Sequence, residues 1–181
     1  IPLHIFEPRY RTMTSDSLDS RGLIAMAIFA GKTWTDDYEG NPPVRPYVCV
    51  GYIVKHDRFD AGRYNLLLQG VCRARIITEL DESTPYRPAV LEPADTSQTM
   101  EVDLDDHRHR IEAYLHHDTL KSLKIVNAIH HWLTSDVPTT AVIDLTIMAI
   151  CEETEQRYAM LAETDPRTRA AWLENLLART R

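Results

Sequence analysis

The stretch PLHIFEPRYR (residues 2–11) predicts the first elements of the fold, because an apolar run ends abruptly at a proline. The run LHIF (3–6) is β-prone. Pro8 cannot donate a hydrogen bond to a neighbouring strand, whereas its fixed φ suits the first turn of a helix. We therefore expect a strand that turns directly into a helix, with Tyr10 and Met13 on the buried face of that helix.

The glycines divide the chain into two parts. All six lie within the first 70 of the 181 residues. Glycine marks turns and bulges in β structure, whereas helix interiors disfavour it. A polar stretch without periodicity, PADTSQTMEVD (93–103), follows the last β-prone segment. We expect two domains, a β domain at 1–95 and a helical domain at 96–181.

Several short strands are expected after the first helix. The apolar run GLIAMAIFA (22–30) fits a strand that is buried on both faces, and a loop rich in Gly, Pro and Asp follows at 31–47. Two long β-prone segments join at Asp60–Gly62 as a hairpin, Gly70 predicts a turn, and RPAVLEP (87–93) forms the last strand. This pattern favours an α+β fold, in which a small β-barrel or sandwich carries one embedded helix.

The second half has helical periodicity throughout. Apolar residues recur on one face of 104–115 and of 120–133. Residues 141–151 are apolar almost all round, so we expect this helix at the centre of the bundle. Asp165 and Pro166 make a suitable N-cap and first residue for the last helix. The second domain is therefore expected to be an α-helical bundle.

Charge and cysteine usage exclude several classes of protein. The formal net charge is −7, with 11 Lys and Arg against 13 Asp and Glu in 1–95, and 9 against 14 in 96–181. Such an acidic surface repels phosphate backbones, so we expect no nucleic-acid partner. No apolar run approaches the roughly 18 residues of a membrane span. The three cysteines are far apart, which favours small buried side chains in a reducing cytoplasm: Cys49, Cys72 and Cys151.

No catalytic or metal-binding motif is complete in the sequence. GxSxG and HExxH are absent, and the tail of a phosphate-binding loop, Gly31-Lys32-Thr33, has Met26 where the motif needs a glycine. Adjacent histidines, as at 116–117 and 130–131, diverge by about 100° around a helix, so neither pair chelates a metal by itself. We expect a protein that is not an enzyme and has no metal and no cofactor.

Several stretches resemble, in order and spacing, the Lon substrate-binding domain, the N-terminal module of the ATP-dependent protease Lon. PLHIFEPRYR (2–11) is similar to the signature near the start of that family, YNLLLQGVCRARI (64–76) to a strand pair, and PYRPAVLEP (85–93) to its closing strand. The end of the chain, DPRTRAAWLENLL (165–177), resembles the helical part. The residues that carry the resemblance, for which structural roles are expected, are Pro2, His4, Phe6, Glu7, Pro8, Arg9, Tyr10, Gly51, Gly62, Gly70, Arg73, Pro85 and Tyr86.

The resemblance implies a PUA-like β-barrel followed by helices, in a stand-alone member that lacks the ATPase motifs and the Ser–Lys protease site of Lon. It implies a role in protein quality control, with unfolded or extended polypeptide as the partner and a separate protease or chaperone as a further one. Family members carry a short strand ahead of the signature. We therefore expect that the natural chain starts before Ile1 and that the first barrel strand is missing here.

Aromatic residues of the 31–47 loop are the candidate contacts for a client polypeptide. Trp34, Tyr38 and Tyr47 could grip apolar side chains, together with a groove where barrel and bundle meet, and an open barrel edge could add a client strand. The alternative is that these aromatics only fix the loop to the barrel.

Two other functions stay open at this point. PUA-like barrels often bind RNA, and a basic stripe of Arg58, Arg63, Arg73 and Arg75 would favour that function. Histidines and carboxylates that converge in a polar pocket would favour a small metal- or ligand-binding enzyme.

Overall fold

The structure, a computed structural model, describes residues 1–31, 34–35, 38, 40–80, 83–95, 99–116 and 124–179. It divides the chain into two units, Ile1–Asp95 and Thr96–Arg181, each with its own core. Two expectations lie outside the described residues: the phosphate-loop tail at Lys32 and Thr33, and the start of the second predicted helix at 120–123.

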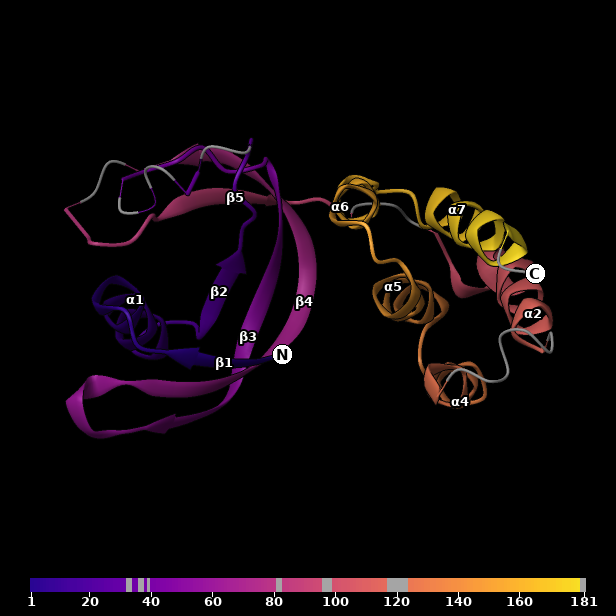
Figure 1. Cartoon of the computed structure of the whole chain (residues 1–181), viewed down its shortest axis with the longest axis horizontal. Coiled ribbons are helices and arrows are strands. Elements are labelled where there is room, and N and C mark those ends of the chain that lie inside the picture. Colours follow the sequence, from indigo (N-terminus) through magenta and orange to yellow (C-terminus); the bar gives the residue numbers. More distant parts are fainter. Residues whose placement is uncertain are drawn as a thin grey trace. The chain divides into compact units, whose positions relative to one another are not determined.

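The predicted transition from strand to helix is confirmed. Strand β1 spans Pro2–Ile5, and helix α1 spans Pro8–Leu18 with its proline at the first helical position. Tyr10 and Met13 are partly buried and pack against the core of the first unit, as their spacing predicts. Figure 1 shows α1 held within the curve of the sheet, beside β1 and β2.

The first unit is built on one antiparallel sheet. Its further strands are β2 (Leu23–Met26), β3 (Tyr47–Arg58), β4 (Tyr64–Glu79) and β5 (Ala89–Pro93). The strand order is β1-β4-β3-β2, and β5 pairs with β4. A short 3-10 turn at Asp60–Gly62 joins β3 to β4, which confirms the predicted hairpin. The first unit is thus a mixed α and β structure.

Strand β4 is continuous through Gly70, so the turn predicted at this glycine is wrong. Val50 pairs with Cys72 and Gly51 pairs with Gly70, which leaves Val71 as the extra residue of a β-bulge. Gly51 lies close to the neighbouring strand, because an added Cβ there would sit 3.4 Å from Leu68 Cβ. The bulge separates two halves of β4, of which the first pairs with β1 and the second with β5.

Among the described residues the sheet is not closed, so the barrel predicted from sequence is seen only as an open sheet. Strand β2 pairs with β3 alone. The expectation that 22–30 is a strand buried on both faces is also wrong. Ile24 is buried, whereas Leu23, which points to the opposite face of β2, is exposed, so only one face of this strand is covered.

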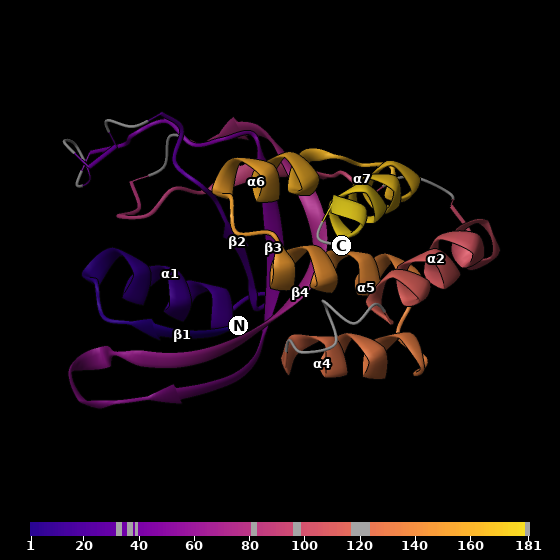
Figure 2. The same cartoon turned by 45° about the vertical axis from the view of Figure 1, so that its right-hand side comes forward.

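The second unit contains helices that surround one apolar core. They are α2 (Asp105–Leu115), α4 (Lys124–Leu133), α5 (Thr139–Ile150), α6 (Thr154–Ala162) and α7 (Pro166–Arg179). Figure 2 shows α5 between α4 and α7. Val142, Ile143 and Ile147 of α5 are buried, whereas Leu145 and Met148 are exposed. This helix therefore keeps one open face, contrary to the expectation of burial all round.

The predicted N-cap of the last helix is confirmed. The Asp165 carboxylate accepts a hydrogen bond of 3.0 Å from the backbone N–H of Arg167. Within the described residues, no helix has the length and apolar character that crossing a membrane requires.

Candidate functional site

The start of α1 is joined to the 31–47 loop by a compact polar contact. Tyr38 donates a hydrogen bond from its hydroxyl to Glu7 Oε1 at 2.9 Å. Arg9 donates from Nε to Glu7 Oε2 at 3.1 Å and from Nη1 to the carbonyl of Tyr38 at 3.3 Å. The Arg9 guanidinium also lies over the rings of Tyr38 and Tyr10, 4.6 and 4.9 Å from their centroids. These contacts combine charge-assisted hydrogen bonds with cation–π attraction.

The contact with Glu7 changes the acidity of the tyrosine. The hydrogen bond to the Glu7 carboxylate raises the pKa of the Tyr38 hydroxyl, and burial raises it further. The cause is that loss of the phenol proton would place the negative charge of the phenolate next to that of the Glu7 carboxylate. Tyr38 therefore stays a neutral donor throughout the physiological pH range.

An aromatic cluster extends this contact along the loop. Trp34 stacks on Phe29 with ring centroids 5.1 Å apart and planes 19° from parallel. Tyr38 meets both rings edge-on, at 6.1 Å from Phe29 and 6.2 Å from Trp34. Both loop aromatics are half-buried. These contacts support the alternative that the aromatics fix the loop, while leaving part of each ring open to a ligand.

A cavity of about 440 Å³ lies next to this cluster, within the first unit. Its volume is in the range of small-ligand and side-chain pockets. Most of its surface comes from the inner face of α1, from strand β2, and from the second half of β4 with β5. The apolar and aromatic side chains of this lining include Ile5, Tyr10, Met13, Ile24, Met26, Phe29, Val44, Ile76 and Leu91.

Arg9, a residue of the lining, has one side-chain nitrogen without a hydrogen-bond partner. Arg9 Nη2 is buried and makes no hydrogen bond to any described residue. A buried N–H of a guanidinium is costly to leave unpaired. Because Nη2 has almost no accessible surface, a ligand oxygen in the cavity would reach this donor only after neighbouring side chains shift.

Two further contacts hold the wall of the cavity in place. Arg87 donates from Nε and Nη2 to the two oxygens of Glu79, each at 2.6 Å, and from Nη1 to the carbonyl of Pro42 at 2.6 Å. Tyr86 donates from its hydroxyl to Asp16 Oδ2 of α1 at 2.8 Å. The segments around Pro42 and Tyr86 are therefore tied to the sheet and to α1.

Comparison with known proteins decides the family. A sequence model described as the ATP-dependent protease La (LON) substrate-binding domain matches residues 1–179. The chain belongs to the Lon substrate-binding domain family. A search of curated protein sequences finds no match.

Solved structures of Lon N-terminal domains share the fold of this family member. The N-terminal domain of a Lon protease of the Mycobacterium avium complex has a TM-score of 0.65 at 14% identity, over 98% of this chain and 89% of that chain. A Lon N-terminal domain protein from Xanthomonas campestris has a TM-score of 0.59 at 20% identity, over 98% of this chain and 88% of that one.

The predicted contact residues of this Lon-family chain separate into two groups. Trp34 and Tyr38 come together beside the cavity, whereas Tyr47 lies at the start of β3 opposite Arg75 and does not line the cavity. Pro85 and Tyr86, expected only as structural residues of the Lon motif, line the cavity wall.

The residues of the opening Lon-like signature have identifiable contacts. His4 Nδ1 lies 2.7 Å from Asn65 Oδ1 on β4, and its ring stacks on Phe6. Glu7 is the N-cap residue of α1, and its carboxylate pairs with Arg9 of the same helix. Gly62 adopts a φ of +71°, which favours glycine.

The arginines whose arrangement as a basic stripe would favour RNA binding are partly neutralised. Arg73 pairs with Asp95 at 3.4 Å, and Arg75 pairs with Glu92 at 3.4 Å. Arg58 lies over the ring of Tyr64. Paired arginines leave little excess positive charge for a phosphate backbone.

The sequence did not indicate several residues of the site. Phe29 was assigned only to an apolar run, Arg87 appeared only within the closing-strand stretch 85–93, and Glu79 lay in no quoted motif. The stacking of Phe29 on Trp34 and the bidentate pair of Arg87 with Glu79 both depend on tertiary contacts. The aromatic residue at the end of an apolar run was the one available signal.

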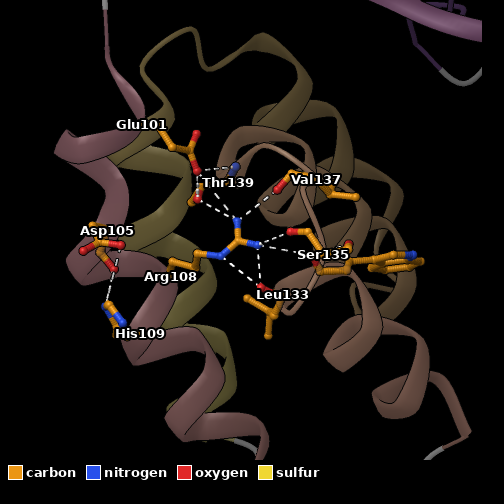
Figure 3. Close-up of polar contacts among 9 residues, drawn as sticks. Glu101, Asp105, Arg108, His109, Leu133, Ser135, Val137 and Thr139 are labelled. Atoms are coloured by element: carbon orange, nitrogen blue, oxygen red, sulfur yellow. Dashed lines mark hydrogen bonds and ion pairs between the residues drawn. The ribbon is translucent and has the colours of Figure 1, made fainter.

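A dense polar network in the second unit provides donors for backbone carbonyls at helix termini (Figure 3). Arg108 of α2 donates hydrogen bonds to the carbonyls of Leu133, Ser135 and Val137 and to Thr139 Oγ1. These carbonyls belong to the end of α4 and the loop before α5, where helical partners are lacking. Glu101 accepts from the backbone N–H of Thr139 at 2.9 Å. Arg108 thus fixes the α4–α5 connection.

The described residues contain no group of three or more His, Cys, Asp or Glu side chains that could hold a metal ion. Cys49 and Cys72 are half-buried, Cys151 is buried, and none of the three forms a disulfide. The site therefore consists of the cavity, the aromatic cluster of Phe29, Trp34 and Tyr38, and the contact between Glu7 and Arg9.

Proposed function

We propose that this member of the Lon substrate-binding domain family recognises unfolded or extended polypeptide segments without catalysing a reaction. The family supports a role in substrate recognition. The observation that carries the proposal for this chain is the cavity of about 440 Å³, whose mostly apolar lining includes Arg9. Apolar side chains of a client would enter the cavity, and a main-chain carbonyl would accept from Arg9.

The composition of the lining supports tolerance of many sequences. Met13 and Met26 are flexible and polarizable, and methionine-rich surfaces adapt to different apolar side chains. The charged groups at the rim are paired, Arg9 with Glu7 and Arg87 with Glu79. A client would therefore be selected for apolar side chains and an exposed main chain rather than for its charge.

The rest of the expected role is also part of this proposal. We propose a PUA-like barrel for the first unit, a place in cytoplasmic protein quality control, and a separate protease or chaperone that receives the bound segment. Unfolded polypeptide exposes the side chains and carbonyls that the cavity would accept, whereas folded protein hides them.

The proposal is tested by calorimetric titration with a polypeptide that is alkylated at its cysteines so that it stays unfolded, and with the same polypeptide in its folded form. We expect binding of the unfolded form only. Met26→Trp would fill part of the cavity from an exposed position and should weaken binding. Val54→Trp, at an exposed strand position outside the lining, is the matched control. The proposal would be contradicted if the two variants bound the unfolded polypeptide with equal affinity, or if titration with the unfolded polypeptide released no heat of binding.

A further inference from the structure

Two histidines from different helices of the second unit lie side by side. His116 is the C-cap residue of α2, and His130 lies in α4. Their ring centroids are 4.7 Å apart, with planes tilted by 45°. Neither of the adjacent pairs at 116–117 and 130–131 can chelate a metal by itself. The fold instead brings together one member of each adjacent pair.

Both histidines directly follow residues of the apolar core. Leu115 directly precedes His116 and Ile129 directly precedes His130, and both of these apolar side chains are fully buried in the same core. His116 is exposed and His130 is half-buried. The imidazoles therefore lie at the edge of a packed helix–helix contact, open to solvent on one side. A preformed pair of this kind needs little reorganisation to bind a cation.

The ring separation fits a shared metal ion. A zinc–nitrogen bond of 2.0–2.1 Å places the metal about 3 Å from the centre of an imidazole ring, so two rings at a tetrahedral angle lie about 5 Å apart. The observed 4.7 Å matches this spacing. Histidine is the nitrogen ligand that zinc and the late first-row divalent metals prefer.

We infer that His116 and His130 form a two-histidine site for a divalent transition-metal ion such as zinc. Water would complete the coordination, because no third described His, Cys, Asp or Glu joins the pair. The bound ion would link the end of α2 to α4 and close the chain segment between them. Such a link stabilises the folded helical unit by mass action. The inference is independent of the proposed binding of polypeptide.

The test uses protein without an affinity tag, stripped with a chelator and then titrated with zinc chloride. Calorimetry should show one zinc ion per chain, and thermal unfolding of the helical unit should move to higher temperature. Both effects should be lost in His116→Gln and in His130→Gln. They should persist in His131→Gln, because His131 is exposed on the same helix and lies outside the ring pair.

A second measurement uses the unmodified protein and therefore does not depend on whether the histidine variants fold. In a nitrogen-detected spectrum of the imidazoles, zinc should shift the ring nitrogens of His116 and His130 and leave those of His109 and His131 in place. The inference is overturned if about 1 mM zinc shifts neither ring. Binding that survives in His130→Gln, or that His131→Gln abolishes equally, would also overturn it.

Discussion

Tyr38 donates a hydrogen bond of 2.9 Å to Glu7, the N-cap residue of α1. The contact joins residues 31 positions apart in the chain. It fixes the loop that carries Trp34 and Tyr38 against the same helix that lines the cavity. The loop aromatics therefore both support the structure and border the site, so the two roles have to be separated by experiment.

A variant that lacks the Tyr38 hydroxyl but keeps the ring should be less stable. We expect Tyr38→Phe to lower the free energy of unfolding of the first unit by about 1 kcal/mol, because Glu7 loses one hydrogen bond and keeps its contact with Arg9. Denaturant unfolding measures this change. Tyr52→Phe, at an exposed position of β3, is the control and should have no effect. A loss as large in Tyr52→Phe would show that the contact with Glu7 is not the cause.

Arg87 should contribute more than a surface ion pair. Its guanidinium bonds both oxygens of Glu79 and the carbonyl of Pro42, with the side chain mostly buried. We expect Arg87→Ala to destabilise the first unit by about 2 kcal/mol. Arg75→Ala removes a pair that is half exposed and 3.4 Å long, and should cost less than about 0.5 kcal/mol. Equal losses in the free energy of unfolding in urea for Arg87→Ala and Arg75→Ala would contradict this prediction.

The second unit should depend strongly on Arg108. Its loss leaves the carbonyls at the end of α4 without donors, so we expect Arg108→Ala to destabilise this unit by about 3 kcal/mol. Arg110→Ala is the matched control, since Arg110 lies on the same helix, is 47% exposed and pairs with Glu174. It should cost less than about 1 kcal/mol. Circular dichroism during denaturant unfolding distinguishes the two variants.

The cap of α7 predicts a pH dependence. The backbone hydrogen bond from Arg167 is the main cause that lowers the pKa of Asp165 below its usual value. A carboxylate with a lowered pKa stabilises the fold above its unfolded pKa near 3.8, and this stabilisation disappears as the pH falls through the lowered value.

Asp165→Ala should therefore cost about 1 kcal/mol at neutral pH, and the difference from the unmodified protein should narrow below about pH 4. Asp165→Asn is the control, because the amide caps a helix without titrating. A cost of the alanine variant that stays constant down to pH 2 would contradict this role of the carboxylate.

Local signals in the sequence predicted most elements of the fold. Pro8 marked the start of α1, Asp60–Gly62 marked the hairpin, and Asp165 with Pro166 marked the start of α7. Each of these signals acts through the backbone of the residue itself or of its immediate neighbours. Such signals can therefore be recognised in the sequence without knowledge of the tertiary structure.

Expectations that depended on partners across the sheet were less reliable. Gly70 was expected at a turn, but it pairs with Gly51 inside a continuous strand beside a bulge. The run 22–30 was expected to be buried on both faces, but only one face of β2 is covered, since Leu23 is exposed beside the buried Ile24. The contacts between Arg9 and Tyr38 and between Arg87 and Pro42 span long stretches of chain. Sequence spacing carries no information about such contacts.

The measurement that tests the central claim most directly is a spectrum of the tryptophan indole N–H groups during titration with unfolded polypeptide. The chain has three tryptophans, of which Trp34 stacks on Phe29 of the cavity lining and Trp132 and Trp172 pack in the helical unit. Our account predicts that the Trp34 resonance shifts with saturation, that the other two stay in place, and that Met26→Trp weakens the shift. A titration that moves only Trp132 or Trp172, or none of the three, would contradict recognition of polypeptide at this cavity.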